Sequence, residues 1–239
     1  MRVALLLAML CARAAADSAT GAIDAQLVTE IDLEPGHVAR PFSLAPDLWW
    51  GAAPRWTIGL VHSHASVDRF EPGATLCLAS SDPLACTHIY RGSGLDARYA
   101  ALPWLAPRAR LLLRDISPVK PAVTLGALVQ GRWGRFALDA DPYLQLGLAN
   151  RDKGNDHALV LPVRAAVDLG SSRVWIDTGW NADFATWRDG WRVPVGAGVK
   201  VHVSSYDVGG ELGFPSLLGP QNTPKVRELI VFVATRWQP

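Results

Sequence analysis

The sequence predicts an all-β protein, a single antiparallel up-and-down transmembrane β-barrel of about twelve strands. Three observations support this prediction. Apolar and polar residues alternate in many segments, short turns alternate with longer loops between these segments, and tryptophan gathers near the short turns. Alternation with a period of two is typical of a strand with two different faces, because successive side chains point to opposite sides.

The two longest segments show the alternation clearly. From residue 136 to 148 every even position is apolar, and Asp139 and Asp141 stand between them. From residue 191 to 203 every odd position is apolar, and Lys200 lies on the opposite face. The same pattern predicts strands over residues 25–33, 43–52, 55–67, 88–101, 107–115, 121–131, 134–148, 157–169, 173–184, 191–203, 206–214 and 226–237.

The connections between these strands alternate in length. The short ones fall at residues 53–54, 102–106, 132–133, 170–172 and 204–205, and the others fall at 34–42, 68–87, 116–120, 149–156, 185–190 and 215–225. Short turns on one side and mostly longer loops on the other are typical of a membrane barrel. An even number of strands also lets the first and last strands pair antiparallel.

The first residues are typical of a secretory signal. Arg2 precedes the apolar run 3–10, and small residues at 14–16 offer a cleavage site before Asp17. We therefore expect residues 1–16 to be removed and residues 17–239 to form one barrel domain. The net charge of +1 gives no basic field for nucleic acid.

Removal of the signal would leave two cysteines, Cys77 and Cys86, which flank a turn-rich stretch. In an oxidising compartment two cysteines this close should pair, so we expect a disulfide between them. The alternative is two unlinked thiols. We expect no metal site, because these residues and His88 supply too few ligands, and the sequence indicates no cofactor.

Alternation alone leaves open which face meets water. A membrane barrel turns its apolar face to lipid and encloses a polar lumen, whereas a soluble barrel does the opposite. Tryptophan favours the membrane interface, and most predicted strands reach the ~9–11 residues that cross a bilayer. Trp175 and Trp180 fit less well, because the first is on the polar face and the second is mid-strand. The tryptophans whose positions favour the membrane barrel are Trp50, Trp56, Trp104, Trp133 and Trp237 near the short turns, and Trp187 and Trp191 at the opposite rim.

The last predicted strand alternates from Leu229 to Trp237 and ends in an aromatic residue, although Gln238 and Pro239 follow it. It resembles the terminal recognition strand of outer-membrane proteins. The chain as a whole resembles the bacterial outer-membrane β-barrel, or porin-like, class, and the stretch 46–63 is similar to barrels of this kind. The resemblance implies an outer-membrane location, a surrounding lipid bilayer, and insertion by the assembly machinery through the C-terminal strand. It implies no substrate and no oligomeric state.

The polar face then lines the lumen and carries both signs of charge. Two interpretations stay open: a narrow aqueous path that passes small polar solutes, or ion pairs across the lumen that plug it. Barrels of ~8 strands are filled by side chains and those of ~16–18 leave a channel, so twelve strands do not decide between them. The expected lumen-lining residues are Asp139, Asp141, Arg164, Asp168, Asp177, Asp183, Lys200, Asp207 and Glu211.

A second class of function is a lipid-modifying enzyme. If Ile58 and Leu60 face lipid, His64 and Ser66 share that face near the outer rim. Outer membrane phospholipase A and the lipid A deacylases are similar in placing His and Ser at the outer lipid boundary, where His64 would activate Ser66 for acyl transfer. The alternative is that these polar residues mark the end of the membrane belt. A third class is a secreted or periplasmic soluble β-barrel that binds a ligand.

Overall fold

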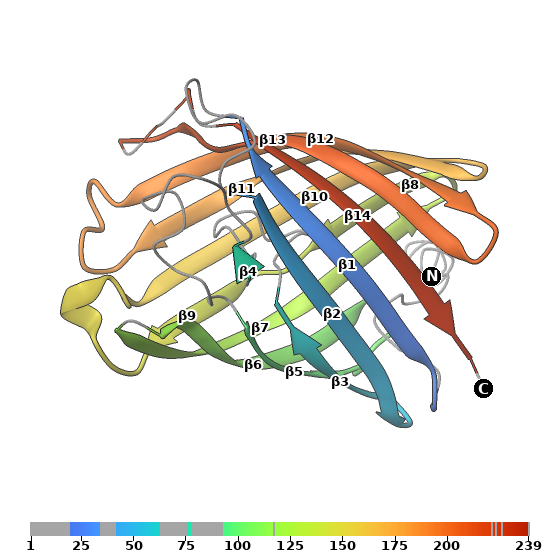
Figure 1. The fold of residues 1–239 in the computed structure, drawn as a ribbon, viewed down its shortest axis with the longest axis horizontal. Helices are drawn as coiled ribbons and strands as arrows, with labels where there is room; N and C mark the ends of the chain where they lie inside the picture. Colours follow the sequence, from blue (N-terminus) through green and yellow to red (C-terminus); the bar gives the residue numbers. More distant parts are fainter. Residues whose placement is uncertain are drawn as a thin grey trace, which may run out of the picture.

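The computed structural model describes residues 20–33, 42–62, 76–77, 93–116, 118–220, 222, 224–225 and 227–238. These residues form a closed antiparallel β-barrel (Figure 1). Its strands are β1 (Ile23–Asp32), β2 (Phe42–Ala53), β3 (Trp56–Val61), β4 (Leu76–Cys77), β5 (Ser93–Tyr99), β6 (Leu105–Ile116), β7 (Val119–Trp133), β8 (Phe136–Ala140), β9 (Tyr143–Gly147), β10 (Ala158–Leu169), β11 (Ser172–Asp183), β12 (Trp191–Val203), β13 (Tyr206–Leu218) and β14 (Glu228–Trp237). A short 3₁₀ helix, η1 (Arg151–Lys153), precedes β10. No helix in the described part of the chain is long and apolar enough to cross a bilayer.

The barrel wall has twelve positions, which confirms the predicted number of strands. β8 and β9 share one position between β7 and β10, and the two-residue β4 pairs with β2 beyond the end of β3. Neighbours along the chain are neighbours in the sheet, as expected for an up-and-down barrel. The first strand closes the barrel by pairing with β14 from Ile23↔Trp237 to Asp32↔Glu228.

The apolar face of the barrel points outward. In β3, Trp56, Ile58 and Leu60 are exposed, whereas the alternate positions 57, 59 and 61 are buried. In β12, Val199 and Val203 are 45% and 56% exposed. An apolar outer surface around a polar interior is the arrangement of a membrane barrel. A soluble barrel is expected to have the reverse arrangement.

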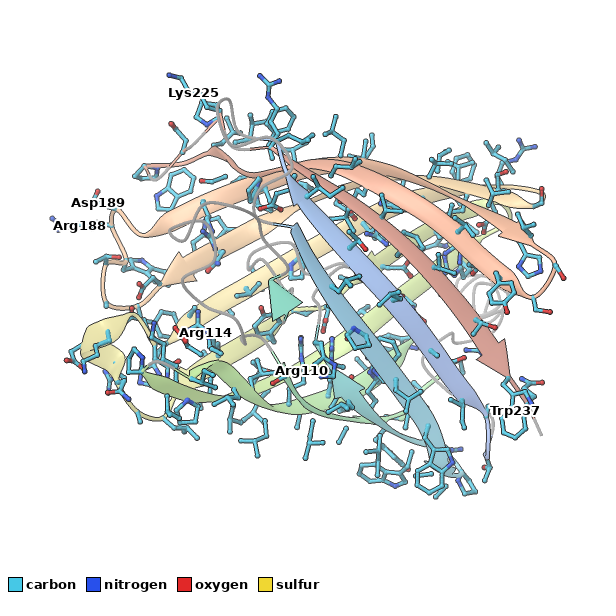
Figure 2. The ribbon with its side chains drawn as sticks, in the orientation of Figure 1. Arg110, Arg114, Arg188, Asp189, Lys225 and Trp237 are labelled. Carbon is cyan, nitrogen blue, oxygen red and sulfur yellow. The ribbon has the colours of Figure 1, made fainter. Side chains whose placement is uncertain are left out.

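Exposed aromatic side chains form a band at the short-turn end. Trp237 marks this end in Figure 2, and Arg188 and Asp189 lie at the far end of the barrel. The far end carries a smaller aromatic group, in which the Trp187 ring lies 5.5 Å from both the Trp180 and Phe184 rings. Two aromatic rims are typical of proteins that sit between two membrane–water interfaces. The short-turn band consists of Trp50, Trp56, Trp104, Trp133, Phe136, Tyr206 and Trp237.

Prolines explain where the strands differ from the prediction. The predicted strand 134–148 is interrupted between β8 and β9 at Pro142, which has no N–H to donate to the sheet. β13 continues four residues beyond the predicted end at residue 214, because a register shift between β12 and β13 accommodates Pro194 and Pro215. β3 ends at Val61, and the predicted strand residues 63–67 and 88–92 lie outside the described residues.

Candidate functional site in the barrel lumen

Charged side chains lie on the inner face of the barrel, because charged and apolar residues alternate along the strands. Figure 2 shows Arg110 and Arg114 within the outline of the barrel. Of the predicted lumen residues, Asp139, Asp141, Asp177 and Glu211 are buried, and Arg164, Asp168, Asp183, Lys200 and Asp207 are half-buried. Asp183 differs from the others, since it accepts a hydrogen bond from the Ala185 N–H at 2.7 Å in the β11–β12 loop.

One group of these charges, the arginine-rich network, consists of Asp96, Arg98, Arg108, Arg110 and Asp141. Arg98 Nε donates to Asp96 Oδ2 at 2.6 Å, and Arg108 Nε donates to Asp96 Oδ1 at 2.9 Å. Arg108 also donates to Asp141, which Arg110 Nη2 contacts at 3.4 Å. The network therefore links β5 and β6 to the segment after β8, and among the described residues it has three cations and two carboxylates.

A second group, the acid-rich network, consists of Arg164, Asp177 and Glu211 on β10, β11 and β13. Arg164 binds Asp177 through two hydrogen bonds of 2.6 and 2.8 Å, and its Nη2 donates to Glu211 at 3.0 Å. Trp175 Nε1 lies 3.1 Å from both Asp177 Oδ2 and Glu211 Oε2. In the part of the chain that the structure describes, one cation here contacts two carboxylates, and the indole N–H is an additional donor.

A tryptophan ring that lies over a glycine of the neighbouring strand adjoins each network, and Trp49 Nε1 donates to Asp96 Oδ2 at 3.1 Å. Trp49 pairs in register with Gly59, where a Cβ would lie 2.3 Å from its Cδ1 atom. Trp175 pairs in the same way with Gly198, where a Cβ would lie 2.3 Å from Cζ2. Only glycine leaves room for a ring at this distance.

Both rings also carry an arginine. The Arg98 guanidinium lies 4.9 Å from the Trp49 ring centre, and the Arg164 guanidinium lies 4.6 Å from that of Trp175. A guanidinium over an aromatic ring is a favourable cation–π contact. The glycine leaves room for the ring, and the ring holds the guanidinium close to the barrel wall.

The ion pairs follow the wall of the barrel. Among the described residues, they join strands of the β5–β8 side or strands of the β10–β14 side with β1, and none joins the two sides. The predicted alternative of ion pairs across the whole lumen is therefore not seen in this part of the chain.

Acids and bases in these pairs are equal in number. A further set lies nearer the short turns, where Lys200 Nζ is 2.5 Å from Asp207 and Arg173 Nε is 2.5 Å from Asp168. Among the described residues, the bases of these pairs are Arg98, Arg108, Arg110, Lys120, Arg132, Arg164, Arg173, Lys200 and Arg236, and the acids are Asp24, Asp96, Asp115, Asp139, Asp141, Asp168, Asp177, Asp207 and Glu211.

Several of these residues were absent from the predicted lumen set, among them Asp24, Asp96, Arg98, Arg132, Arg173 and Arg236. Their positions in alternating strands were the available signal. Asp96 and Arg98 share one face of β5, and Asp24 and Arg236 lie opposite each other in the β1–β14 register. What the sequence did not supply was the register that brings each acid to its base.

The candidates for lipid chemistry, His64 and Ser66, lie outside the described residues, so that hypothesis stays a prediction. The last described residue before them is His62, whose backbone N–H donates to Asp47 Oδ1 at 2.5 Å. The disulfide between Cys77 and Cys86 also stays a prediction, because Cys86 lies outside the described residues.

Comparison with known proteins identifies similar folds and no family. No protein-family model and no curated protein sequence matches the chain. Solved structures similar to it include a loop-deletion mutant of OmpT from Vibrio cholerae, with a TM-score of 0.43 and 11% identity over 90% of this chain and 98% of that one. The translocator domain of the autotransporter NalP from Neisseria meningitidis has a TM-score of 0.45 and 9% identity over 99% and 92% of the two chains. An anion-selective porin from Comamonas acidovorans has a TM-score of 0.37 and 14% identity, and the match spans 82% of this chain and 59% of the porin.

Proposed function

We propose that the protein resides in the outer membrane and passes small polar solutes through a narrow lumen whose charges balance one another. The outward apolar face and the two aromatic rims support the membrane location. Residues 1–16 would act as the export signal. β14, which ends at Trp237, would be the segment that the assembly machinery recognises.

One observation carries the proposal of passage: the ion pairs of the described residues follow the wall and do not cross the lumen. The rings of Trp49 and Trp175 lie over Gly59 and Gly198, so they also leave the centre of the barrel free of their bulk. Of the residues that we propose as the lining, Arg164, Asp168, Lys200 and Asp207 keep surface that a solute could contact, whereas the buried Asp139, Asp141, Asp177 and Glu211 would act through their charge.

The charge balance predicts weak ionic selectivity. A lumen with one dominant sign of charge concentrates ions of the opposite sign, whereas equal numbers of acids and bases give little net field along the path. Small polar solutes with no net charge are therefore the class that this lining favours.

The test is conductance of the refolded protein in planar lipid bilayers, with folding checked by heat-modifiable migration on gels. We expect small, stable current steps and a reversal potential near zero in a salt gradient. The lipid-facing variant Ala197→Leu serves as the control and should conduct as the wild type does. Folded protein that inserts and stays silent would contradict passage and leave a structural barrel.

A further inference from the structure

A cavity of about 570 Å³ lies at the short-turn mouth of the lumen, on the seam where β1 closes the barrel against β14. It exists because the inward residues at its base are small or slender, namely Ala234 on β14 and Gln26 on β1. Trp49 borders it on the β2 side. The complete lining is Asp24, Ala25, Gln26, Trp49, Lys200, His202, Ser205, Asp207, Ala234, Thr235 and Arg236.

The charges at this cavity already compensate one another. Arg236 Nη2 donates to Asp24 Oδ2 at 3.0 Å. Lys200 Nζ is 2.5 Å from Asp207 Oδ2, and His202 Nδ1 is 2.9 Å from Asp207 Oδ1. A charged ligand would have to displace one member of a pair and leave the other without compensation, which costs free energy.

A hydroxyl group meets no such penalty. An ammonium has three donor hydrogens and a carboxylate has about four acceptor positions, so the Lys200–Asp207 pair retains capacity for hydrogen bonds to a neutral ligand. The Gln26 amide both donates and accepts hydrogen bonds, and it lines the same cavity. Ala234 and the edge of Trp49 supply apolar surface for the C–H groups of the same ligand.

We propose, on the basis of the passage proposed above, that this cavity binds a small uncharged polyhydroxylated solute of the size of a mono- or disaccharide. Its volume falls in the ~300–1,000 Å³ typical of small-molecule sites. The solute would be held at the short-turn mouth by hydroxyl contacts to Asp207, Lys200 and Gln26, with the ion pairs intact.

The test measures binding without any need for conductance. Sucrose and maltose serve as neutral probes, glutamate and spermidine as ionic probes, and saturation-transfer NMR on the protein in detergent micelles reports binding. We expect both sugars to saturate in the millimolar range and both ionic probes to bind at least tenfold more weakly. Equal binding of ionic and neutral probes, or binding of neither sugar, would overturn the proposal.

Two variants locate the site. Ala234→Trp fills the cavity and should lower sugar affinity at least tenfold, whereas Val233→Trp, on the lipid-facing side of the same strand, should leave it unchanged. Gln26→Leu keeps the volume and removes the amide, and should lower affinity several-fold even where the larger change disturbs folding. Sugar affinity that survives both Ala234→Trp and Gln26→Leu would place binding elsewhere.

The outcomes separate the two proposals. Sugar binding with silent bilayers would remove passage and keep the site. Ion currents from protein that binds neither sugar would remove the site and keep passage.

Discussion

The arginine-rich and acid-rich networks solve the same structural problem with opposite charge. In each, a tryptophan lies over a glycine of the neighbouring strand and contacts an arginine, through Trp49 and Arg98 in one and Trp175 and Arg164 in the other. The arginine-rich network has three guanidinium groups around two carboxylates, and the acid-rich network has two carboxylates around one guanidinium.

The difference shows what each component does. The glycine and ring are common to both networks, so they set how close to the wall the cation is held. Both networks have two carboxylates among the described residues, so the number of arginines sets the sign of the charge that these residues carry together. The acid-rich network depends on a single arginine and should therefore be the more sensitive of the two to substitution.

The largest expected effect is the loss of Asp177. Asp177→Ala leaves Arg164 with one carboxylate partner and removes one acceptor from the Trp175 N–H, so we expect about 3–5 kcal/mol of destabilisation, as for other broken buried pairs. Urea unfolding in detergent, followed by tryptophan fluorescence, measures it. The matched control is Asp168→Ala, whose side chain is 39% exposed; exposed pairs contribute about 1 kcal/mol or less. Equal effects of the two changes would show that burial does not distinguish these pairs.

The next effect concerns the glycine under each ring. Gly198→Val and Gly59→Val would each force a tryptophan ring off the wall, and overpacking of this kind typically costs about 1–3 kcal/mol. Gly210→Val is the control, because its nearest neighbour to a new Cβ is a backbone oxygen at 3.1 Å and no ring lies over it. The midpoint of urea unfolding reports all three. A control that destabilises as much as the other two would refute the role of the ring.

An effect of similar size separates the two indole N–H groups. Trp175→Phe removes a donor that lies near two carboxylates, and Trp49→Phe removes one that bonds to Asp96 alone. A hydrogen bond to a charged group contributes about 1.5–3 kcal/mol, so we expect a loss in this range for Trp49→Phe and a larger one for Trp175→Phe. The reverse order in unfolding measurements would contradict the dependence of the acid-rich network on its tryptophan.

The smallest effect is electrostatic. Asp141→Asn should make the lumen more anion-selective and Arg164→Gln more cation-selective. One charge at ~5 Å in a water-like medium changes local ion concentration about fourfold. Reversal potentials in a salt gradient measure the change, and it should shrink as ionic strength rises. Shifts of the same sign in both variants would refute the charge balance.

The alternation of apolar and polar residues predicted most of the fold. The pattern assigned the outward and inward faces correctly in residues 136–148 and 191–203. The tryptophans near the short turns indicated which face meets lipid. Pro142 and Pro215 were harder to interpret, because a proline within a strand can end it, interrupt it or occupy a bulge, and only the partner strand decides which. β13 continues past Pro215 because its register with β12 shifts at Pro194.

The site was less predictable than the fold. Asp177 and Glu211 were expected to face the lumen, but their shared partner Arg164 depends on the register of β10 through β13. Trp175 was a poor fit to an aromatic rim, and the reason is its place inside, against Gly198 and two carboxylates. Such contacts between strands leave no pattern within a single strand, so local sequence does not reveal them.

The pairing of β1 with β14 determines when the barrel can close during folding. Ile23 pairs with Trp237, and Asp24 binds Arg236, although nearly the whole chain separates the two residues of each pair. Contacts so distant in sequence form slowly, because a long loop has to be closed before any of them is made. Until the last strand has been synthesised and delivered, β1 keeps an unpaired edge that invites association with other chains. Truncation at either end would therefore be expected to yield an aggregating polypeptide rather than a smaller barrel.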